Sequence, residues 1–592
     1  MNLCLVSIHI QRSNKAVALG NAMLASSLKR RFGNQIRVDL LDLYLDDPAG
    51  DCVDRILQLQ PEWVGLSLAV WNRGMGLEIA EKLKTLRPEL VILAGGPEAT
   101  ADRRQLSGLP CIDLVFAGEG EDLLAEAVAR FLDGAAIPSL QEDQPPASIK
   151  DLSLLPSPWL DGTLKPAELD GLVWELSRGC PFKCDFCFES LGTEGIRRFP
   201  RERLQNELAL FAASGVRQIF VLDPTFNYQQ DEAKQILRLM TETAPGIQFN
   251  IEIRSEFIDR EMAEMFAGLN CSLQIGLQSA DPAVLARINR TFNPKDFQRK
   301  MLLLHEAGAT YGFDLIYGLP GDSLSGFLAS LDFALSMAPN HLDIFPLSVL
   351  PSTRLAETAS GFGLVYKRQP PYRVLSTPTF GAEDLARAAG IAEACTLFYS
   401  RGAAVPWFGL LLENLAWSPG VFFSRLSDWL QAKQVDRTGV LRLQQDFLRD
   451  LFEELEHPDR GRIAVDIATW FGCQASLADP SLPCESEEPK AGYNCLNPLA
   501  RFARFRTDPG ELRNHLHGGI SDFEELAFFM EEDPCEAVLY LHEGEVDCFR
   551  LTEEQARFLK TLPKKMEETS PSEELADFLL EAETRGIVRT GE

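Results

Sequence analysis

The sequence lacks a long apolar run, and it has fewer basic than acidic residues. No stretch of about 18 apolar residues occurs, so no membrane-spanning helix is expected. The opening MNLCLVSIHI predicts a buried strand rather than a secretory signal. Lys and Arg total 57 against 86 Asp and Glu, a net charge of −29, which argues against a nucleic-acid-binding protein. The 13 cysteines are mostly scattered singly, which suits a reducing compartment. We therefore expect a cytoplasmic protein that binds neither nucleic acid nor membrane.

The first part of the chain alternates strand and helix patterns. Within residues 1–135 this rhythm is typical of a parallel α/β sheet, in which ligands bind at the carboxyl ends of the strands. The expected strands cover 3–8, 36–41, 63–68, 90–94 and 112–116, and the expected helices cover 15–31, 74–86 and 120–133. Residues 136–170 contain six prolines and no clear periodicity, which predicts a linker between domains.

A second alternation predicts a partial (β/α)6 barrel over residues 171–369, with its chemistry at the carboxyl ends of the strands. The expected strands cover 172–177, 217–222, 248–254, 272–277, 310–317 and 342–349. Residues 370–530 read as a helical extension, in which LARFARFRTDPGELRNHL (499–516) fits an amphipathic helix. Residues 531–592 read strand, strand, helix, helix, as in a small α+β, winged-helix-like module. The fold class is therefore α/β with a mainly helical C-terminal region.

Three cysteines stand close together directly after the first predicted barrel strand. In CPFKCDFC they are Cys180, Cys184 and Cys187, and no fourth cysteine or histidine lies nearby. A structural zinc site would use four ligands, in most cases two separated pairs. A [4Fe–4S] cluster held by three thiolates instead leaves one iron open for an exogenous ligand. The triplet therefore favours a reactive cluster, with zinc as the alternative.

The triplet resembles the CxxxCxφC motif of the radical S-adenosylmethionine (SAM) family, with Phe186 as the aromatic residue before the last cysteine. The resemblance implies that SAM binds the open iron and is cleaved to a 5′-deoxyadenosyl radical. Later segments resemble family elements in the expected order, namely VLDPTF, IEIRSEFI, IGLQSADPAVLARINR and YGFDLIYGLPGDS. They imply SAM-binding roles for Asp223, Glu252, Arg254, Gln278, Ser279 and Gly318. Singly, each segment also fits ordinary barrel packing.

The loops of the first domain resemble the cobalamin-binding domain that precedes many radical SAM barrels. The similar stretches are GLSLAVWNRG, ILAGGPEAT and DLVFAGEGEDLLAEAVARFLDG. A nucleotide-binding Rossmann domain is the alternative, but no GxGxxG follows the first strand. Glu119 and Glu121 stand at the start of a helix, where they could accept hydrogen bonds from the corrin amides. The resemblance implies a cobalamin site built from Ser67, Trp71, Asn72, Arg73, Gly95, Gly96, Pro97, Glu98, Gly118, Glu119, Gly120 and Glu121.

One histidine departs from the pattern of proteins that ligate cobalt. The loop after the first strand reads SIHIQR, so His9 lacks the Asp and Gly of a DxHxxG motif. We therefore expect His9 to be a surface or hydrogen-bonding residue. The resemblance then implies that Trp71, Asn72 or Arg73 lies near the lower face of cobalt.

Together these motifs predict a cobalamin-dependent radical SAM enzyme with three cofactors: a [4Fe–4S] cluster, SAM and cobalamin. Its expected reaction is methyl transfer to an unactivated carbon of a small-molecule or peptide substrate. An electron donor such as flavodoxin or ferredoxin is the expected partner. Two alternatives remain at this point: a rearrangement or cyclisation catalyst that uses the same cofactors, and a cobalamin-binding sensor or partner-binding protein.

Overall fold

The computed structural model describes residues 1–135, 146–189, 195–433, 435–478, 493–497, 500–519, 522–542, 545–562, 564–565 and 573–590. It forms two compact units, which are described separately. The first covers residues 1–339 and 343–386, and the second covers 340–342 and 387–592. Part of the predicted linker, residues 136–145, lies outside the described residues.

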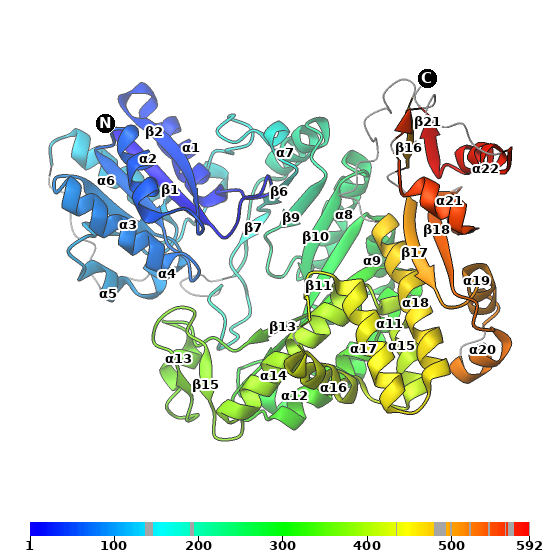
Figure 1. Cartoon of the computed structure of the whole chain (residues 1–592). Helices are drawn as coiled ribbons and strands as arrows, with labels where there is room; N and C mark the ends of the chain where they lie inside the picture. Colours follow the sequence, from blue (N-terminus) through cyan, green and yellow to red (C-terminus); the bar gives the residue numbers. More distant parts are fainter. Residues whose placement is uncertain are drawn as a thin grey trace. The chain divides into compact units, whose positions relative to one another are not determined.

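The first unit begins with a five-stranded parallel sheet in the order β2-β1-β3-β4-β5 (Figure 1). Its strands are β1 (Asn2–His9), β2 (Arg37–Tyr44), β3 (Trp63–Ser67), β4 (Val91–Gly95) and β5 (Leu114–Val115). The strand cores are apolar on both faces because helices cover each side, as a parallel sheet requires. One face packs on α1 (Leu19–Phe32) and α6 (Gly120–Leu132). The other packs on α2 (Ala49–Gln58), α3 (Arg73–Leu86), α4 (Pro97–Ala101) and α5 (Arg103–Ser107).

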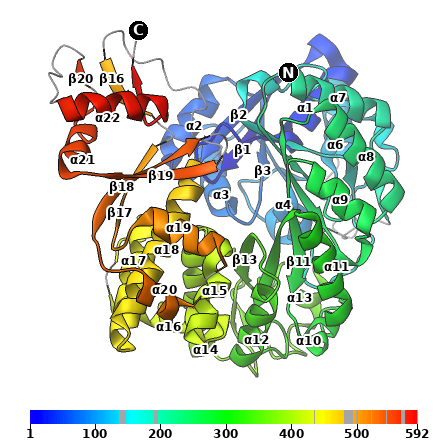
Figure 2. The same ribbon diagram turned by 90° about the vertical axis from the view of Figure 1, so that its right-hand side faces the viewer.

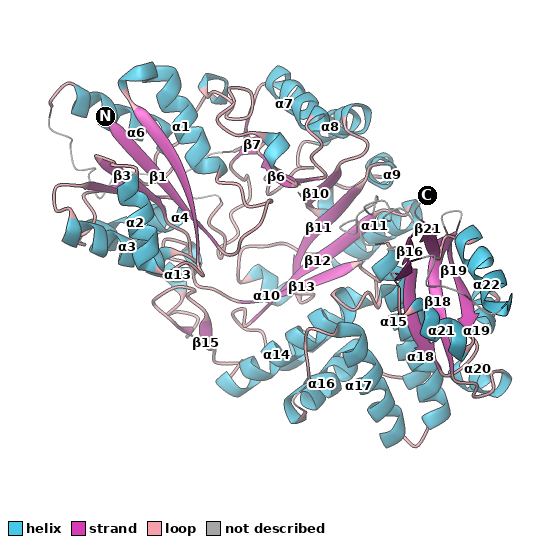
Figure 3. Ribbon diagram, turned by 45° about the horizontal axis from the view of Figure 1, so that its top comes forward, coloured by secondary structure: helices cyan, strands magenta, loops and turns pink. Residues whose placement is uncertain are grey.

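The chain then forms a six-stranded sheet in the order β13-β12-β11-β10-β9-β6 (Figure 3). The strands are β6 (Gly171–Trp174), β9 (Gln218–Val221), β10 (Gln248–Ile253), β11 (Cys271–Gln278), β12 (Thr310–Tyr317) and β13 (His341–Pro346). Neighbours from β6 to β12 pair in parallel. The crossovers are α7 (Arg201–Ala213), α8 (Gln230–Thr243), α9 (Arg260–Gly268), α10 (Pro282–Ala286), α11 (Pro294–Ala307) and α12 (Leu324–Leu335). This sequential order confirms the partial barrel.

The segment between these two sheets is a folded part of the first unit. Residues 146–170 carry two 3-10 turns, Leu152–Leu154 and Pro166–Glu168, and bury Leu152 and Trp159. After β6 the short ribbon β7 (Ser177–Arg178) pairs with β8 (Arg197–Arg198) and precedes the cysteines. The first unit ends with α13 (Arg354–Thr358), β14 (Val365–Tyr366) and β15 (Val374–Ser376). The domain boundaries drawn from the sequence stay predictions.

The second unit is mainly helical in its first half. It contains most of α14 (Ala382–Cys395), a π-helical turn at Thr396–Ser400, α15 (Val405–Leu415), α16 (Pro419–Ala432), α17 (Val440–Glu454) and α18 (Pro458–Leu477). The helices pack through aromatic residues, among which Phe398 contacts the rings of Phe422 and Phe447. Within the described residues, every helix is too short or too polar to cross a lipid bilayer.

The end of the second unit forms two small sheets (Figure 2). One has the order β17-β18-β19, formed by Ala500–Phe505, Cys535–His542 and Glu545–Leu551, and the other has the order β20-β16-β21, formed by Lys564–Lys565, Tyr493–Leu496 and Val588–Thr590. Helices α21 (Glu553–Leu559) and α22 (Glu573–Thr584) follow β19, as expected from the sequence. Two further helices are α19 (Pro509–His517) and α20 (Phe523–Phe529).

The prediction of one helix over residues 499–516 is wrong. Its first part is strand β17, which pairs antiparallel with β18 from Ala500 opposite Tyr540 to Phe505 opposite Cys535. The helix α19 begins only at Pro509, capped by the Asp508 carboxylate, which accepts hydrogen bonds from the Gly510 and Glu511 amides. Pairing with a neighbouring strand therefore overrode the helical periodicity of this stretch.

Candidate functional site

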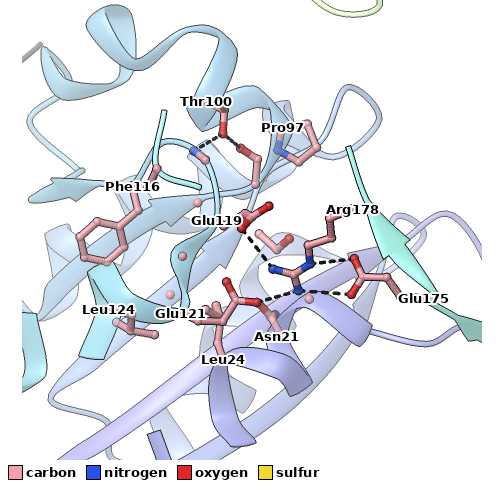
Figure 4. A pocket seen from close by; sticks show the side chains of 18 of the residues that line it. Asn21, Leu24, Pro97, Thr100, Phe116, Glu119, Glu121, Leu124, Glu175 and Arg178 are labelled. Atoms are coloured by element: carbon pink, nitrogen blue, oxygen red, sulfur yellow. Dashed lines mark hydrogen bonds and ion pairs between the residues drawn. The ribbon is translucent and has the colours of Figure 1, made fainter. Parts of the chain in front are cut away.

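A cavity of about 390 Å³ lies where the first sheet meets the barrel (Figure 4). The first sheet contributes residues at the carboxyl ends of β3 and β4 and at the start of α6. The barrel contributes residues on both sides of the cysteine triplet. From the first sheet come Gly65, Leu66, Ser67, Gly95, Gly96, Pro97, Gly118, Glu119, Gly120 and Glu121, and from the barrel come Glu175, Ser177, Arg178, Gly179, Phe188, Glu189, Leu222 and Pro224.

Several glycines line this cavity. A Cβ on Gly65 would lie 2.7 Å from Leu5 Cδ2, and a Cβ on Gly96 would lie 2.7 Å from the Leu68 carbonyl oxygen. Gly118, with φ +89°, lies so close to Ala147 that any side chain would collide with its backbone. A Cβ on Gly95, in contrast, would meet nothing within 4 Å. Gly65, Gly96 and Gly118 therefore allow close packing at the cavity wall, whereas Gly95 faces open space in which part of a large ligand such as a corrin would fit.

Eight of the twelve predicted cobalamin-site residues line this cavity. They are Ser67, Gly95, Gly96, Pro97, Gly118, Glu119, Gly120 and Glu121. Trp71, Asn72, Arg73 and Glu98 do not line it.

The residues expected near the lower face of cobalt have other contacts. The buried Asn72 amide donates to the carbonyls of Ile8 and Ser67 and accepts from the Ala69 amide, so it fixes the loop after β3. Trp71 is 55% exposed, and its Nε1 donates to the Ile8 carbonyl at 3.2 Å. His9 Nε2 lies 2.8 Å from Asp42 Oδ1, so this histidine has a hydrogen-bonding partner.

Arg73 and Glu98 form a buried cluster away from the cavity. Arg73 Nη1 lies 2.7 Å from Glu98 Oε2, and Nη2 lies 2.6 Å from Asp102 Oδ2. The Tyr372 hydroxyl donates to Glu98 at 2.6 Å, and burial raises the pKa of this phenol. These bonds hold the segment before β15 against the first sheet.

The two glutamates at the start of α6 are engaged in ion pairs. Glu119 accepts hydrogen bonds from Arg197 at 2.6 and 2.9 Å and from the Ile149 amide at 2.6 Å. Burial acts to raise the pKa of Glu119, but the bonds from Arg197 and Ile149 outweigh it and lower that pKa. Both carboxylates therefore bind arginines of the barrel region.

Arg178 connects the cavity to the cysteine loop. Its Nη2 lies 2.8 Å from Glu121 Oε1, its Nε lies 3.0 Å from Glu175 Oε1, and its Nη1 lies 3.6 Å from Glu119 Oε2 (Figure 4). The guanidinium is mostly buried, and burial raises the pKa of Glu175 in spite of this partner. Because Arg178 stands two residues before Cys180, the network fixes the start of the loop.

The loop itself presents three free, partly exposed thiols. Burial raises the pKa of Cys180, and it raises the pKa of Cys187 to about 11. Among the described residues, no three His, Cys, Asp or Glu side chains are grouped tightly enough to hold one metal ion. A [4Fe–4S] cluster needs no such grouping, since each thiolate binds a different iron. The donor set of three cysteines fits the cluster, with a fourth position left for SAM.

Two arginines lie beside the Cys184 thiol, namely Arg254 and Arg290. The Arg254 guanidinium stacks 3.8 Å above the Phe182 ring and pairs with Glu256 at 2.5 Å. Burial, and then the neighbouring Arg254, lower the pKa of Arg290. Positive charge at this position would stabilise an anionic cluster or the carboxylate of a ligand.

The predicted SAM residues of the barrel differ in their surroundings. The buried Asp223 carboxylate accepts from the Ser177 amide at 2.9 Å, and burial raises its pKa to about 6. Burial also raises the pKa of Glu252. Ser279 contacts Ser330 at 3.3 Å and accepts from the Asp281 amide, so it holds α12 in place. Gly318, with φ +86°, packs under Val374 and Leu385.

Gln278 has a buried side-chain oxygen that could accept a hydrogen bond from a ligand. It is 9% exposed, has φ +69°, and its Oε1 has no hydrogen-bond partner within the described part of the chain. Its Nε2 would lie 2.6 Å from a Cβ on Gly276, so the amide lies over this glycine next to Arg290. A buried, unpaired amide oxygen of this kind costs about 1–3 kcal/mol unless a donor reaches it.

Sequence reasoning missed three polar residues of the barrel interior. They are Arg290, Gln274 and Asp314. Gln274 Nε2 donates to Asp314 at 2.5 Å and lies 3.3 Å from Asp343. Burial, with smaller contributions from Asp343 and Glu252, raises the pKa of Asp314 to about 7. The available signal was a charged residue within an otherwise apolar strand, TYGFDLIY.

Comparison with known proteins gives two domain matches. Residues 174–334 match the Radical SAM superfamily, and residues 8–128 match the B12 binding domain. A Radical SAM domain implies a [4Fe–4S] cluster and SAM, and a B12 binding domain implies cobalamin. These two domain matches confirm the predicted fold class and cofactors.

Two curated relatives extend the likeness over about half of the chain. The cobalamin-dependent radical SAM methyltransferase TokK of Streptomyces tokunonensis is 28% identical over 53% of this chain and 50% of its own length. The 2-(S-pantetheinyl)-carbapenam-3-carboxylate methyltransferase of Streptantibioticus cattleyicolor is 28% identical over 51% and 50%. This chain thus spans half the length of these two relatives.

A solved structure shares the fold. It is the radical SAM methyltransferase TsrM of Kitasatospora setae, with cobalamin and a [4Fe–4S] cluster bound. It superposes with a TM-score of 0.52 at 18% identity, over 62% of this chain and 81% of that one.

Proposed function

We propose that this chain, a radical SAM protein with a B12 binding domain before the barrel, is a methyltransferase that alkylates an unactivated carbon of a small molecule. When bound, the cluster supplies the electron that cleaves SAM to a radical, and cobalamin supplies a carrier for the methyl group. The names of the two curated relatives, both methyltransferases, support this reaction.

The observation that carries the proposal is the shared cavity. Its walls come from the carboxyl end of the first sheet and from residues 175–179 and 188–189, which flank the cysteine triplet. A methyl carrier bound against Gly95 and Gly118 would therefore lie in the same cavity as the residues that flank the cluster-binding cysteines. Proximity of this kind can supply about 7–11 kcal/mol of a reaction barrier.

The chain's own residues would divide the work of binding. Cys180, Cys184 and Cys187 would hold the cluster, with Arg254 and Arg290 as the nearby positive charges. Gln278 Oε1, Asp314 and Glu252 would accept hydrogen bonds from the hydroxyl and amino groups of SAM. Asp223 would keep the segment before the triplet in place through the Ser177 amide. Trp71 lies in the loop after β3 and outside the lining of this cavity, so its placement near the lower face of cobalt stays a prediction.

The electron donor would be a small redox protein such as flavodoxin or ferredoxin, because radical SAM enzymes typically need a reductant. Its delivery site is the partly exposed cysteine loop.

Product analysis tests the proposal. The full chain, loaded anaerobically with cluster and cobalamin, would be incubated with reductant and SAM. Both S-adenosylhomocysteine and 5′-deoxyadenosine should form. Cys184→Ala should abolish deoxyadenosine, whereas Gly95→Leu, which fills the cavity, should abolish S-adenosylhomocysteine and keep deoxyadenosine. Deoxyadenosine without S-adenosylhomocysteine from the loaded wild-type chain would overturn methyl transfer in favour of another radical reaction.

A further inference from the structure

The second unit contains a cavity of about 840 Å³ at one end of the sheet β17-β18-β19. It lies where β17 ends, β18 begins and β19 passes into α21, and helices α17 and α18 also contribute to it. The lining residues are Gln445, Arg449, Val465, Arg504, Phe505, Arg506, Pro534, Cys535, Glu536, Arg550, Leu551, Thr552, Glu553, Ala556, Arg557 and Lys560.

The charge of this lining opposes that of the surrounding chain. Six cationic side chains face two acidic ones, Glu536 and Glu553. Residues 531–592 nevertheless carry 17 acidic and 7 basic side chains. Three of those 7 cations, Arg550, Arg557 and Lys560, line this one cavity. Basic side chains are therefore concentrated at this cavity, although residues 531–592 contain few of them.

The cations differ in whether they have partners. Arg504 and Lys560 both pair with Glu536, and Arg550 pairs with Asp533 at 2.5 Å. Arg506 and Arg557 pair with no acidic residue in the part of the chain that the structure describes. Two exposed guanidinium groups are therefore free to bind an anion at the cavity wall.

The backbone around these arginines is held firmly. The buried Asp466 carboxylate accepts from the Arg506 and Thr507 amides at 2.8–3.0 Å and from the Thr507 hydroxyl at 2.8 Å. On the other side, Thr552 and Gln555 form a capping box that fixes the start of α21, the helix carrying Arg557. Binding would need little ordering of the backbone, which favours affinity.

The floor of the cavity is apolar. Val465, Phe505, Leu551 and Ala556 are buried core residues that also line it. An apolar floor below a cationic wall fits a ligand with both an anionic and an apolar part. The volume lies within the range of about 300–1,000 Å³ that small-molecule sites occupy, which favours a small molecule over a macromolecule.

We propose that this cavity binds a small anionic molecule through its phosphate or carboxylate groups, with Arg506 and Arg557 as the residues that contact the anion. Arginine suits this role because its planar fork binds either oxyanion with two parallel hydrogen bonds. The site belongs to the second unit alone, and it is independent of the methyl transfer proposed for the first.

Calorimetric titration of the full chain tests this site. Pyrophosphate and citrate serve as the probes, and they distinguish a phosphate ligand from a carboxylate one. At least one should bind, and its affinity should fall as salt is added, because the charges are exposed. The double variant Arg506→Gln/Arg557→Gln should bind that probe about tenfold more weakly or worse, since two charge-assisted contacts are lost.

A matched control is Arg442→Gln. Arg442 lies on α17 in the same unit, its side chain is 87% exposed, and it does not line the cavity. This variant should bind the probe as the wild type does. The proposal is overturned if neither probe binds or if the double variant binds as tightly as the wild type.

Discussion

Arg178 Nη2 and Glu121 Oε1 lie 2.8 Å apart, and this ion pair joins the segment before the cysteine triplet to the first turn of α6. Both side chains are almost fully buried, at 12% and 5% exposure, and both line the cavity at the end of the first sheet. A wall of the cavity expected to hold cobalamin is therefore bonded directly to the loop expected to hold the cluster.

Glu121→Gln should destabilise the chain through this contact. The change leaves the Arg178 charge short of one buried partner, and loss of one partner of a buried ion pair costs about 3–5 kcal/mol. Because Glu175 and Glu119 remain near Arg178, we expect the lower end of this range. Chemical denaturation measures the free energy of unfolding of the first unit.

The matched control is Glu126→Gln on the same helix. Glu126 is exposed and pairs with Arg130 and Arg31 at the surface, so its loss should cost no more than about 1 kcal/mol. Equal effects of the two changes would contradict the importance of the Arg178 network.

Gly95→Leu should reduce the cobalamin retained by the chain about tenfold or more without unfolding it. A Cβ at Gly95 meets nothing within 4 Å, so the new side chain would enter the open cavity rather than the core. Absorbance after gel filtration measures bound cobalamin. The control Gly50→Leu also meets no neighbour but lies on the exposed start of α2, outside the cavity, and should retain cobalamin fully. Full retention by Gly95→Leu would show that cobalamin binds elsewhere.

Cys184→Ala should remove the iron–sulfur cluster, because two thiolates hold a [4Fe–4S] cluster poorly. Iron and sulfide analysis of the reconstituted chain should fall to near background. Cys548→Ala removes a partly buried thiol from β19 in the second unit and should leave the iron content unchanged. A normal cluster in the first variant would mean that Cys184 is not a ligand.

Asp314→Asn should stabilise the chain at high pH only. The pKa of Asp314 is raised to about 7 by burial, whereas the unfolded chain holds this proton with a pKa near 3.9. The folded state therefore binds more protons, and the free energy of unfolding falls as pH rises from about 4 to about 7. Asparagine keeps the oxygen that accepts from Gln274 but does not ionise. The free energy of unfolding of the variant should therefore exceed that of the wild type by on the order of 1–4 kcal/mol at pH 8 and differ little from it at pH 4.

Denaturant titrations at the two pH values would measure this difference. The exposed Asp54→Asn on α2 provides the comparison, because a surface substitution should change the free energy of unfolding by no more than about 0.5 kcal/mol. A gain from Asp314→Asn that is independent of pH would rule out titration of this carboxyl as its cause.

The sequence predicted both sheets and the cysteine loop because these features depend on local pattern. Apolar runs separated by amphipathic helices specify parallel strands, and the triplet is complete within eight residues. The helix α2 was missed, although its buried Cys52, Val53 and Ile56 follow a helical spacing. The strand β17 was taken for a helix because its partner, β18, begins 30 residues further along the chain.

Contacts between distant residues could not be predicted in this way. Glu119 and Glu121 were expected to face a corrin, but their partners Arg197 and Arg178 stand 78 and 57 residues away. The same holds for Arg73, whose cluster includes Tyr372, 299 residues further along. Motif reasoning identifies which side chains belong to a site, and only the fold shows which of them are already paired.

Amide hydrogen exchange of the full chain, with and without cobalamin, tests most directly whether one cavity joins the two cofactor sites. Cobalamin should slow exchange in residues 65–67, 95–97 and 118–121 and, in the same experiment, in residues 175–179 before the cysteine triplet. Slower exchange confined to the first sheet, or none in either region, would contradict the shared cavity.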